Sequence, residues 1–245
     1  MSFIFRKKTE VFMFVWNTKI MYSQLGRNCA LSLPALLDLF QDIATLHAHQ
    51  MGSGLEYLYS IDRAWIMSRW RVRLGTLPRC GDDVAVRTRA YECRRALNRR
   101  AFELVGEGGQ VLAQADSLWT LIDTKAGGPV NAADIVQPYL TPGEGPELGD
   151  LPRKVQLPEG AVAGPDFSIT ADLLDTNHHV NNVRSVALAM RFLPEDFAFT
   201  ALAVDYHHPL LPHTVVTPLC APTDRGFVVA LTAGGRTCVS AEFIR

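Results

Sequence analysis

The chain has 245 residues, of which 48% are hydrophobic and 20% are charged, and its formal net charge is −1. This length suffices for one large domain or two smaller ones, and the near-neutral charge gives no sign of nucleic-acid binding. The longest apolar runs are far shorter than the roughly 20 residues that span a bilayer. The apolar patch near the N-terminus is too short for a secretory signal. We therefore expect a cytoplasmic protein without membrane insertion and without a nucleic-acid partner.

The first half of the chain predicts a strand and then a long helix. Residues 10–22 are rich in β-branched and aromatic side chains, which favours a strand. Ser32 is a suitable N-cap for the following helix, Pro34 stands in its first turn, and Gly52 is a suitable stop. Apolar residues recur between these signals at helical spacing. A helix with one buried face is therefore expected between residues 32 and 52.

Four segments with period-2 alternation follow, and each predicts a half-buried antiparallel strand. They are residues 63–74, 83–94, 97–106 and 110–123. Residues 127–163 are dense in proline and glycine and contain few apolar pairs, which is typical of a linker laid across a surface.

The second half repeats this order of elements. A strand is expected at 166–175 and a helix from about Val183, which Pro194 helps to end. Four alternating segments then follow, at 200–210, 213–222, 226–234 and 235–245. Each half is thus one long helix with an antiparallel sheet, an α+β architecture in which the helix covers the apolar face of the sheet. Two such halves side by side could join their sheets and cover exposed edges.

The stretch Asp175–Asn182, DTNHHVNN, concentrates hydrogen-bonding side chains ahead of the second helix. In an extended stretch residues two apart point the same way, so Asp175, Asn177 and His179 would line one side of a loop. Asn181 or Asn182 would cap the helix, whose free N–H groups suit an oxyanion. His takes a proton from water at neutral pH, Asn orients a water or carbonyl, and Asp fixes the His tautomer or acts as base. The alternative interpretation is a turn with Asx hydrogen bonds and a helix cap.

This stretch and its helix, DLLDTNHHVNNVRSVALAMRFLP, resemble the signature of the acyl-ACP thioesterase family. The segments LLDLFQDIATLHAHQMGSG and NRRAFELVGEGGQVLAQADSLWTLID also resemble that family, and the resemblance runs from about Glu10 to the C-terminus. It implies two tandem hotdog domains forming a pseudo-dimer. These are an acyl-binding domain at 1–126, a linker at 127–163 and a catalytic domain at 164–245.

The resemblance further implies a hydrolase that releases a fatty acid from the phosphopantetheine thioester of acyl carrier protein and so terminates fatty acid synthesis. The family's catalytic Asp, Asn and His fall on Asp175, Asn177 and His179. No cofactor is expected and no metal, since adjacent His207 and His208 would point to opposite faces of a strand.

The chain departs from the family pattern after the second helix. Pro209 stands where the family usually carries a Glu, and Leu210 stands where plant members often have a Cys, so a Cys-His-Asn scheme cannot operate there. On a strand, Asp205 and His207 share a face with position 209 and are candidates for a supporting role. Ser185 and Leu188 replace the Tyr and Trp of many members.

Two groups of arginines are candidates for docking an acidic carrier protein. Arg94, Arg95, Arg99 and Arg100 flank an expected hairpin turn, where a solvated charged hairpin is the alternative, and Arg69, Arg71 and Arg73 mark one face of an expected strand. Gln41 and Asp42 on the first helix are either a vestigial site of a duplicated ancestor or residues that face solvent.

Several functions compatible with this fold remain open. Besides hydrolysis of acyl-ACP, they are hydrolysis of acyl-CoA, acyl binding without catalysis, which Pro209 suggests, and a dehydratase, which the octet fits less well. Because two fused hotdogs already form a pseudo-dimer, either a monomer or a homodimer is expected.

Overall fold

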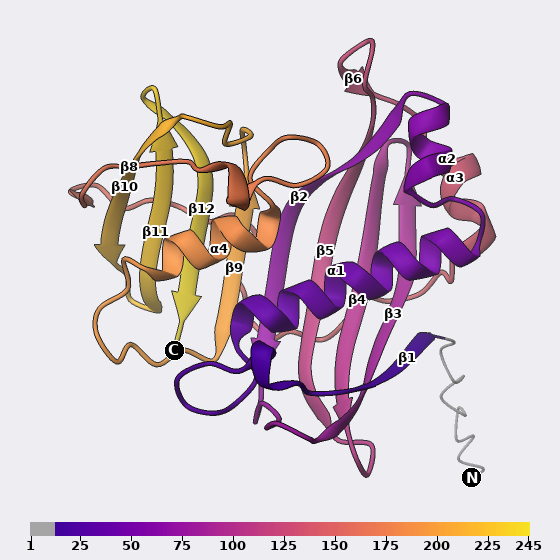
Figure 1. The fold of residues 1–245 in the computed structure, drawn as a ribbon, viewed down its shortest axis with the longest axis horizontal. Coiled ribbons are helices and arrows are strands. Elements are labelled where there is room, and N and C mark those ends of the chain that lie inside the picture. The colour runs from indigo at the N-terminus through magenta and orange to yellow at the C-terminus, as the bar shows by residue number, and fades with distance from the viewer. Residues whose placement is uncertain (1–12) are drawn as a thin grey trace, which may run out of the picture.

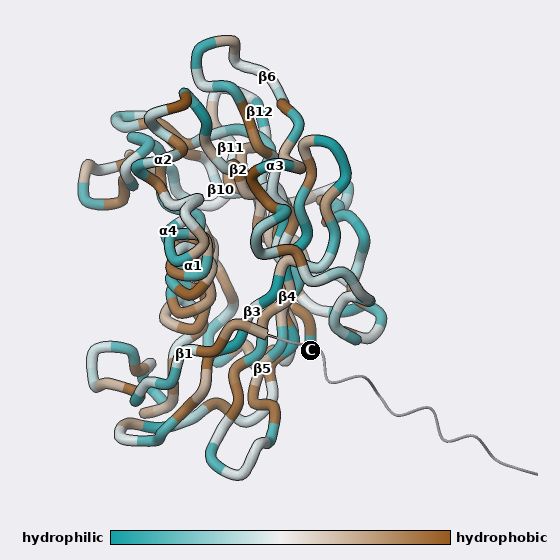
Figure 2. Tube along the Cα trace, turned by 90° about the vertical axis from the view of Figure 1, so that its right-hand side faces the viewer, coloured by the Kyte–Doolittle hydropathy of each residue, from teal (hydrophilic) through white to brown (hydrophobic). Residues whose placement is uncertain are grey.

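One twisted antiparallel sheet organises the protein, and two helices lie on the same face of it (Figures 1 and 2). The computed structural model describes residues 13–245. The strands of the first half are β1 (Phe14–Lys19), β2 (Arg63–Leu74), β3 (Asp83–Arg94), β4 (Leu97–Gly106), β5 (Val111–Asp123) and β6 (Gly128–Pro129). Those of the second half are β7 (Val162–Ala163), β8 (Phe167–Ser168), β9 (Ala201–Tyr206), β10 (Val215–Pro222), β11 (Gly226–Ala233) and β12 (Arg236–Ile244).

The two halves share this sheet because β2 pairs with β9. The main path of strands runs β1-β3-β4-β5-β2-β9-β12-β11-β10-β7. In the β2–β9 pair, Arg69 lies opposite Asp205 and Arg73 lies opposite Ala201. Each half thereby covers an edge that the other would leave open. The expectation that the two sheets join is confirmed.

The helices are α1 (Leu33–Gln50), α2 (Leu55–Ser60), α3 (Ala133–Val136) and α4 (Asn182–Met190), with 3-10 turns η1 (Tyr22–Gln24), η2 (Gln137–Tyr139) and η3 (Ala171–Leu173). The long helix α1 begins as its sequence predicts, since Ser32 Oγ accepts a hydrogen bond from the Ala35 N–H at 3.3 Å. Its buried face packs on the sheet, where the Phe40 ring lies 5.1 Å from that of Phe102 and 6.3 Å from that of Trp70. These aromatic contacts anchor α1 over the first-half strands.

The shorter helix α4 covers the second half of the sheet. Asn181 is its N-cap and accepts from the Val183 N–H at 2.8 Å, as expected. One face of α4 is fully buried, and Arg184 reaches Asp38 of α1 at 3.6 Å. In Figure 2 the two helices lie on one side of the sheet, so their apolar faces share one core.

The segment after β5 crosses the opposite face of the sheet. Arg71 donates to the carbonyl oxygens of Pro152 at 2.6 Å and Arg153 at 2.9 Å, and Arg73 donates to that of Leu148 at 2.7 Å. Strand alternation points these arginines away from the core that Trp70 enters. The interpretation of Arg71 as part of a docking patch is therefore wrong, because its guanidinium is buried under the segment it holds.

Three local expectations differ from the structure. The strand expected at 166–175 is limited to β8, because the chain then turns through η3, where the Leu173 N–H donates to Thr170 O. The first strand covers only Phe14–Lys19 of the expected span, and residues 10–12 lie outside the described part. The helix α2 follows Gly52 and was not anticipated.

We expect Asp205→Asn to destabilise the protein by about 3 kcal/mol, because it leaves the buried Arg71 guanidinium without its counter-ion. The Asp205 carboxylate accepts from Arg71 Nη2 at 2.8 Å and from the Val155 N–H at 2.7 Å. The matched control is Asp83→Asn, which breaks the exposed pair with Lys19 and costs under about 1 kcal/mol. Urea unfolding measures both values. Equal losses of unfolding free energy in the two variants would contradict the claim that the buried Arg71–Asp205 ion pair stabilises the junction of the two halves and the connecting segment.

Candidate active site

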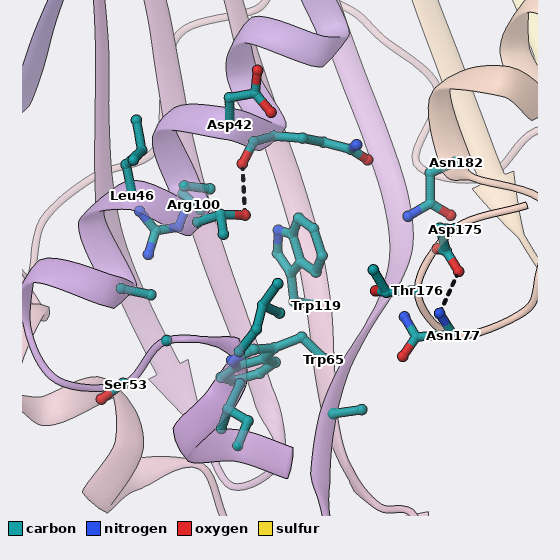
Figure 3. Close-up of a pocket in the computed structure, with 18 of the residues that line it drawn as sticks. Asp42, Leu46, Ser53, Trp65, Arg100, Trp119, Asp175, Thr176, Asn177 and Asn182 are labelled. Atoms are coloured by element: carbon teal, nitrogen blue, oxygen red, sulfur yellow. Dashed lines mark hydrogen bonds between the residues drawn. The ribbon is translucent and has the colours of Figure 1, made fainter.

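A cavity of about 930 Å³ lies where the octet Asp175–Asn182 meets the first half of the chain (Figure 3). The first half contributes most of its wall, including Gln41, Asp42, Leu58, Tyr59, Trp65, Asn98, Arg100, Trp119 and Tyr139. The second half contributes Leu174, Asp175, Thr176, Asn177, Asn181 and Asn182. Its wall is thus aromatic and apolar on one side and rich in carboxylate and amide groups on the other.

The octet forms a tight turn rather than an extended stretch. The Asp175 N–H donates to His179 O at 2.8 Å, the His178 N–H donates to Asp175 O at 3.0 Å, and His178 has a φ of 58°. The Asp175 carboxylate accepts from the Asn177 N–H at 2.8 Å, which is an Asx turn. The expectation that Asp175, Asn177 and His179 line one side of an extended loop is wrong, because these local hydrogen bonds curl the backbone. The alternative interpretation, a turn with an Asx hydrogen bond and a helix cap, describes this backbone.

This turn brings two of the three expected residues to the cavity. Asp175 and Asn177 line it, and Figure 3 shows both on the side of the cavity away from Arg100. His179 is half-buried and does not belong to the wall, although its backbone pairs with that of Asp175 across the neck of the turn. Asp175 and His179 are therefore neighbours at the base of the turn.

Contacts from both halves hold the turn in place. Tyr59 of α2 donates from its hydroxyl to Thr176 Oγ1 at 3.1 Å. The Val180 N–H donates to Leu210 O at 2.9 Å, and the Tyr206 hydroxyl donates to Asn182 O at 2.9 Å. The position of the turn over the cavity thus depends on the packing of α2 as well as on the second half.

Gln41 and Asp42 also line the cavity, where Gln41 is half-buried and Asp42 is exposed, so the expectation that they face solvent holds for Asp42. Burial raises the pKa of Asp42, and the nearby charge of Asp38 raises it further. The two residues extend the polar wall along α1, which brings first-half polar groups to a cavity edged by the second-half turn.

Arg100 is buried and lines the cavity, so its interpretation as a surface docking residue is wrong. Its Nη1 donates to His47 Nδ1 at 3.2 Å, and its guanidinium lies 5.3 Å from the centre of the Tyr139 ring. Strand alternation was the missed signal, because it places Arg100 on the same face of β4 as the core residue Phe102.

The other arginines of this hairpin remain at the surface with different partners. Arg94 Nε lies 2.6 Å from Glu92 and Arg99 Nη2 lies 2.6 Å from Asp116, whereas Arg95 stands exposed at the turn with a φ of 54°. Two of the three remaining positive charges are therefore already neutralised by carboxylates of the chain.

His47 is neutral at physiological pH because burial, together with the positive charge of Arg100, lowers its pKa to about 4. Arg100 can only donate, so Nδ1 of His47 accepts and the ring proton resides on Nε2. The Phe14 ring stacks on the imidazole with centroids 4.6 Å apart. The helical spacing of the sequence places His47 on the same face as the core residues of α1, and it is buried there, where it holds Arg100.

Asp205 and His207 lie away from the cavity wall. The Asp205 carboxylate is held by Arg71 on the opposite face of the sheet, and exposed His207 has Nε2 at 3.4 Å from Ser240 Oγ. Neither placement supports a role at the octet.

Across residues 13–245, no group of three or more His, Cys, Asp and Glu side chains is arranged to hold a metal ion. Within the same residues, no helix combines the length and apolar character needed to cross a bilayer.

The sequence profile described as "Acyl-ACP thioesterase N-terminal domain" matches residues 10–139. The chain belongs to the acyl-ACP thioesterase family. It is 23% identical over 231 residues to "Acyl-[acyl-carrier-protein] hydrolase FATB2, chloroplastic" of Cuphea viscosissima, covering 86% of this chain and 56% of that protein. It is 22% identical to "Palmitoyl-acyl carrier protein thioesterase, chloroplastic" of Gossypium hirsutum, covering 92% of this chain and 59% of that protein. The chain thus spans little more than half the length of these curated relatives.

Solved structures match over nearly the whole chain. An acyl-ACP thioesterase from Bacteroides thetaiotaomicron superposes with a TM-score of 0.85 at 18% identity, covering 95% of this chain and 97% of that one. The 12:0-ACP thioesterase from Umbellularia californica superposes with a TM-score of 0.82 at 20% identity, covering 95% and 96%. At these identities the likeness establishes the fold, and the expected tandem hotdog architecture is confirmed.

We expect His47→Asn to flatten the acid loss of stability between pH 6.5 and pH 4. The folded-state pKa of His47 lies below the unfolded value of 6.5, so the fold opposes its protonation. The contribution of His47 to the free energy of unfolding is fully present above pH 6.5. It is lost as the pH falls towards 4, because unfolding then takes up about one proton at His47. Asn preserves an acceptor for Arg100 and cannot titrate. Thermal unfolding of both proteins from pH 4 to 8 measures the difference, and parallel curves would contradict a buried neutral His47.

Proposed function

We propose that this protein hydrolyses the thioester of a fatty acyl group on the phosphopantetheine arm of acyl carrier protein, which ends chain extension and releases a free acid. The observation that carries the proposal is the polar turn Asp175–His179, whose Asp175 and Asn177 face a cavity of about 930 Å³. Cavities of this size bind small ligands with an apolar body and a few oriented polar groups. Family membership supports the same activity.

The acyl chain would occupy the first-half side of the cavity. Trp65 of β2, Trp119 of β5 and Leu58 of α2 supply apolar area there. The thioester would then stand at the polar turn, which is where the chemistry requires hydrogen-bonding groups. Under this proposal the first half of the chain binds the acyl group and the second half supplies the catalytic residues.

The octet residues support a water-mediated hydrolysis. A water oxygen bonds to the thioester carbonyl carbon while its proton passes to His179 or Asp175, and the carbon–sulfur bond breaks as the thiolate leaves and is protonated. The Asn177 amide would hold the water or the carbonyl oxygen, and the N-terminus of α4 would favour the developing negative charge. Asp175 lies beside His179 at the neck of the turn and would orient its imidazole.

Acyl carrier protein is the partner that follows from this substrate. Among the hairpin arginines at the surface, Arg95 forms no ion pair with a residue of the described part and is the most available to an acidic surface, whereas Arg94 and Arg99 would have to exchange Glu92 and Asp116 for the partner. Docking through such residues would accelerate encounter and would weaken as salt rises. A KM for acyl-ACP that rises with salt, beside poor use of acyl-CoA, distinguishes the carrier protein from coenzyme A as the donor.

Acyl binding without turnover is the second candidate, and the position of Asp205 supports it. With Pro209 in the place of a family Glu, Asp205 was the nearest candidate carboxylate on that strand, but it is committed to Arg71 on the opposite face. Saturable binding of acyl chains with no thiol release would favour this candidate.

We expect His179→Ala and Asn177→Ala each to lower kcat at least 100-fold, about 2.7 kcal/mol, because under this proposal His179 takes the proton of the attacking water and Asn177 holds that water or the carbonyl oxygen. Free-thiol release from acyl-ACP substrates of C8 to C18 measures the loss. The matched control is His178→Asn, since His178 is exposed in the same turn and Asn tolerates its left-handed conformation. That control is expected to retain turnover. Full activity in the His179 and Asn177 variants would refute the assignment.

A further inference from the structure

Arg100 is a buried cation whose charge is unmatched within the described residues. Only 4% of the residue is exposed, and its partners are all neutral. Its Nη1 donates to His47 Nδ1 at 3.2 Å and Thr88 Oγ1 at 3.4 Å, and its guanidinium lies 5.3 Å from the centre of the Tyr139 ring. None of the ion pairs formed by residues 13–245 includes Arg100. A buried charge without a counter-ion raises the free energy of the folded state, and a bound ligand that carries an acceptor would offset this cost.

Two other arginines near the sheet centre, Arg71 and Arg63, are each paired with a carboxylate of the chain. Buried Arg71 has the Asp205 carboxylate at 2.8 Å and several backbone carbonyl oxygens besides. Arg63 also lines the cavity, but its Nη1 lies 2.6 Å from the Asp123 carboxylate. Arg100 alone among these three faces the cavity without a carboxylate of the described chain. The missing acceptor therefore belongs to whatever fills the cavity.

The position of Arg100 places that acceptor far from the catalytic turn. Arg100 stands on β4, which β5 separates from β2, so strand spacing sets it roughly 10 Å from the β2 edge of the cavity. In Figure 3, Trp119 and Trp65 lie between Arg100 and the pair Asp175 and Asn177. A chain whose thioester rests at the turn would pass these indoles before it reaches the guanidinium.

We propose that Arg100 binds an oxygen acceptor at the distal end of the acyl chain, so that the preferred substrates are ω-oxygenated acyl thioesters, foremost those with a terminal carboxylate. This inference rests on the proposed function and names its substrate class. A carboxylate would neutralise the buried charge and accept a charge-assisted hydrogen bond, and a terminal hydroxyl would accept a weaker one. A plain methyl end would leave the guanidinium unmatched. Neutral His47 orients Arg100 without competing for the anion.

The experiment compares matched acyl-ACP thioesters from C8 to C16 that end in a methyl, a hydroxyl or a carboxylate. For wild type at the best chain length, kcat/KM is expected to be at least tenfold higher for the carboxylate than for the methyl, with the hydroxyl between. In Arg100→Met this ratio is expected to fall to one or below. Arg63→Met is the matched control and is expected to keep the ratio, because Arg63 is already paired. A wild-type preference for the methyl end, or a ratio that survives in Arg100→Met, would overturn the inference.

Equilibrium binding separates this inference from the proposed function. If no thioester is hydrolysed, the proposed function fails, and the site is then tested on wild type alone. Quenching of tryptophan fluorescence, to which Trp65 and Trp119 at the cavity contribute, would follow titration with a long-chain diacid monomethyl ester and with the monoacid methyl ester of equal length. Tighter binding of the charged ester by at least tenfold supports the site. Equal binding overturns it, and because no variant is needed a failure of Arg100→Met to fold does not affect the result.

Discussion

The pairing of β2 with β9 is the constraint on which the rest of the molecule depends. It joins the sheets of the two halves into one, and it sets α1 and α4 side by side over a common core. Neither half could cover its inner sheet edge alone, and an open edge is prone to pair with other chains. The ion pair of Arg71 with Asp205 lies across this same joint and pins the connecting segment to its outer face. One strand pair therefore fixes both the arrangement of the halves and the path between them.

The cavity is a consequence of that joint. Its walls come from α1, α2 and the first-half strands, while its polar rim comes from the turn that precedes α4. The bond from Tyr59 to Thr176 ties these parts where they meet. The apolar wall and the polar turn can thus diverge separately within one fold, because they lie on different stretches of chain held together by the sheet.

Electrostatics inside the cavity differ at its two ends. Near the turn stand the carboxylate of Asp175 and the amides of Asn177 and Asn182, whereas at the other end stands the guanidinium of Arg100 beside a neutral histidine (Figure 3). Electrostatic interactions with a bound ligand are stronger at buried positions such as that of Arg100, because screening by water is weak there. A thioester carbonyl suits the first end, and an oxygen acceptor on the chain suits the second. The aromatic side chains between them, Trp65 and Trp119, suit an apolar body.

The sequence by itself determined the elements with strong local signals. Period-2 alternation marked β2, β3 and β4 residue for residue, and the cap Ser32 with the apolar stripe marked α1. The octet could be recognised as a polar loop ahead of a helix, with Asn181 as a candidate helix cap. Tertiary structure alone decided that Asp175 and Asn177 reach the cavity while His179 stands beside it, because backbone hydrogen bonds within the turn set those directions. Strand alternation in the sequence could have placed Arg100 on the face of Phe102, but only the tertiary structure showed that its guanidinium is held by His47 of α1 at the wall of a cavity.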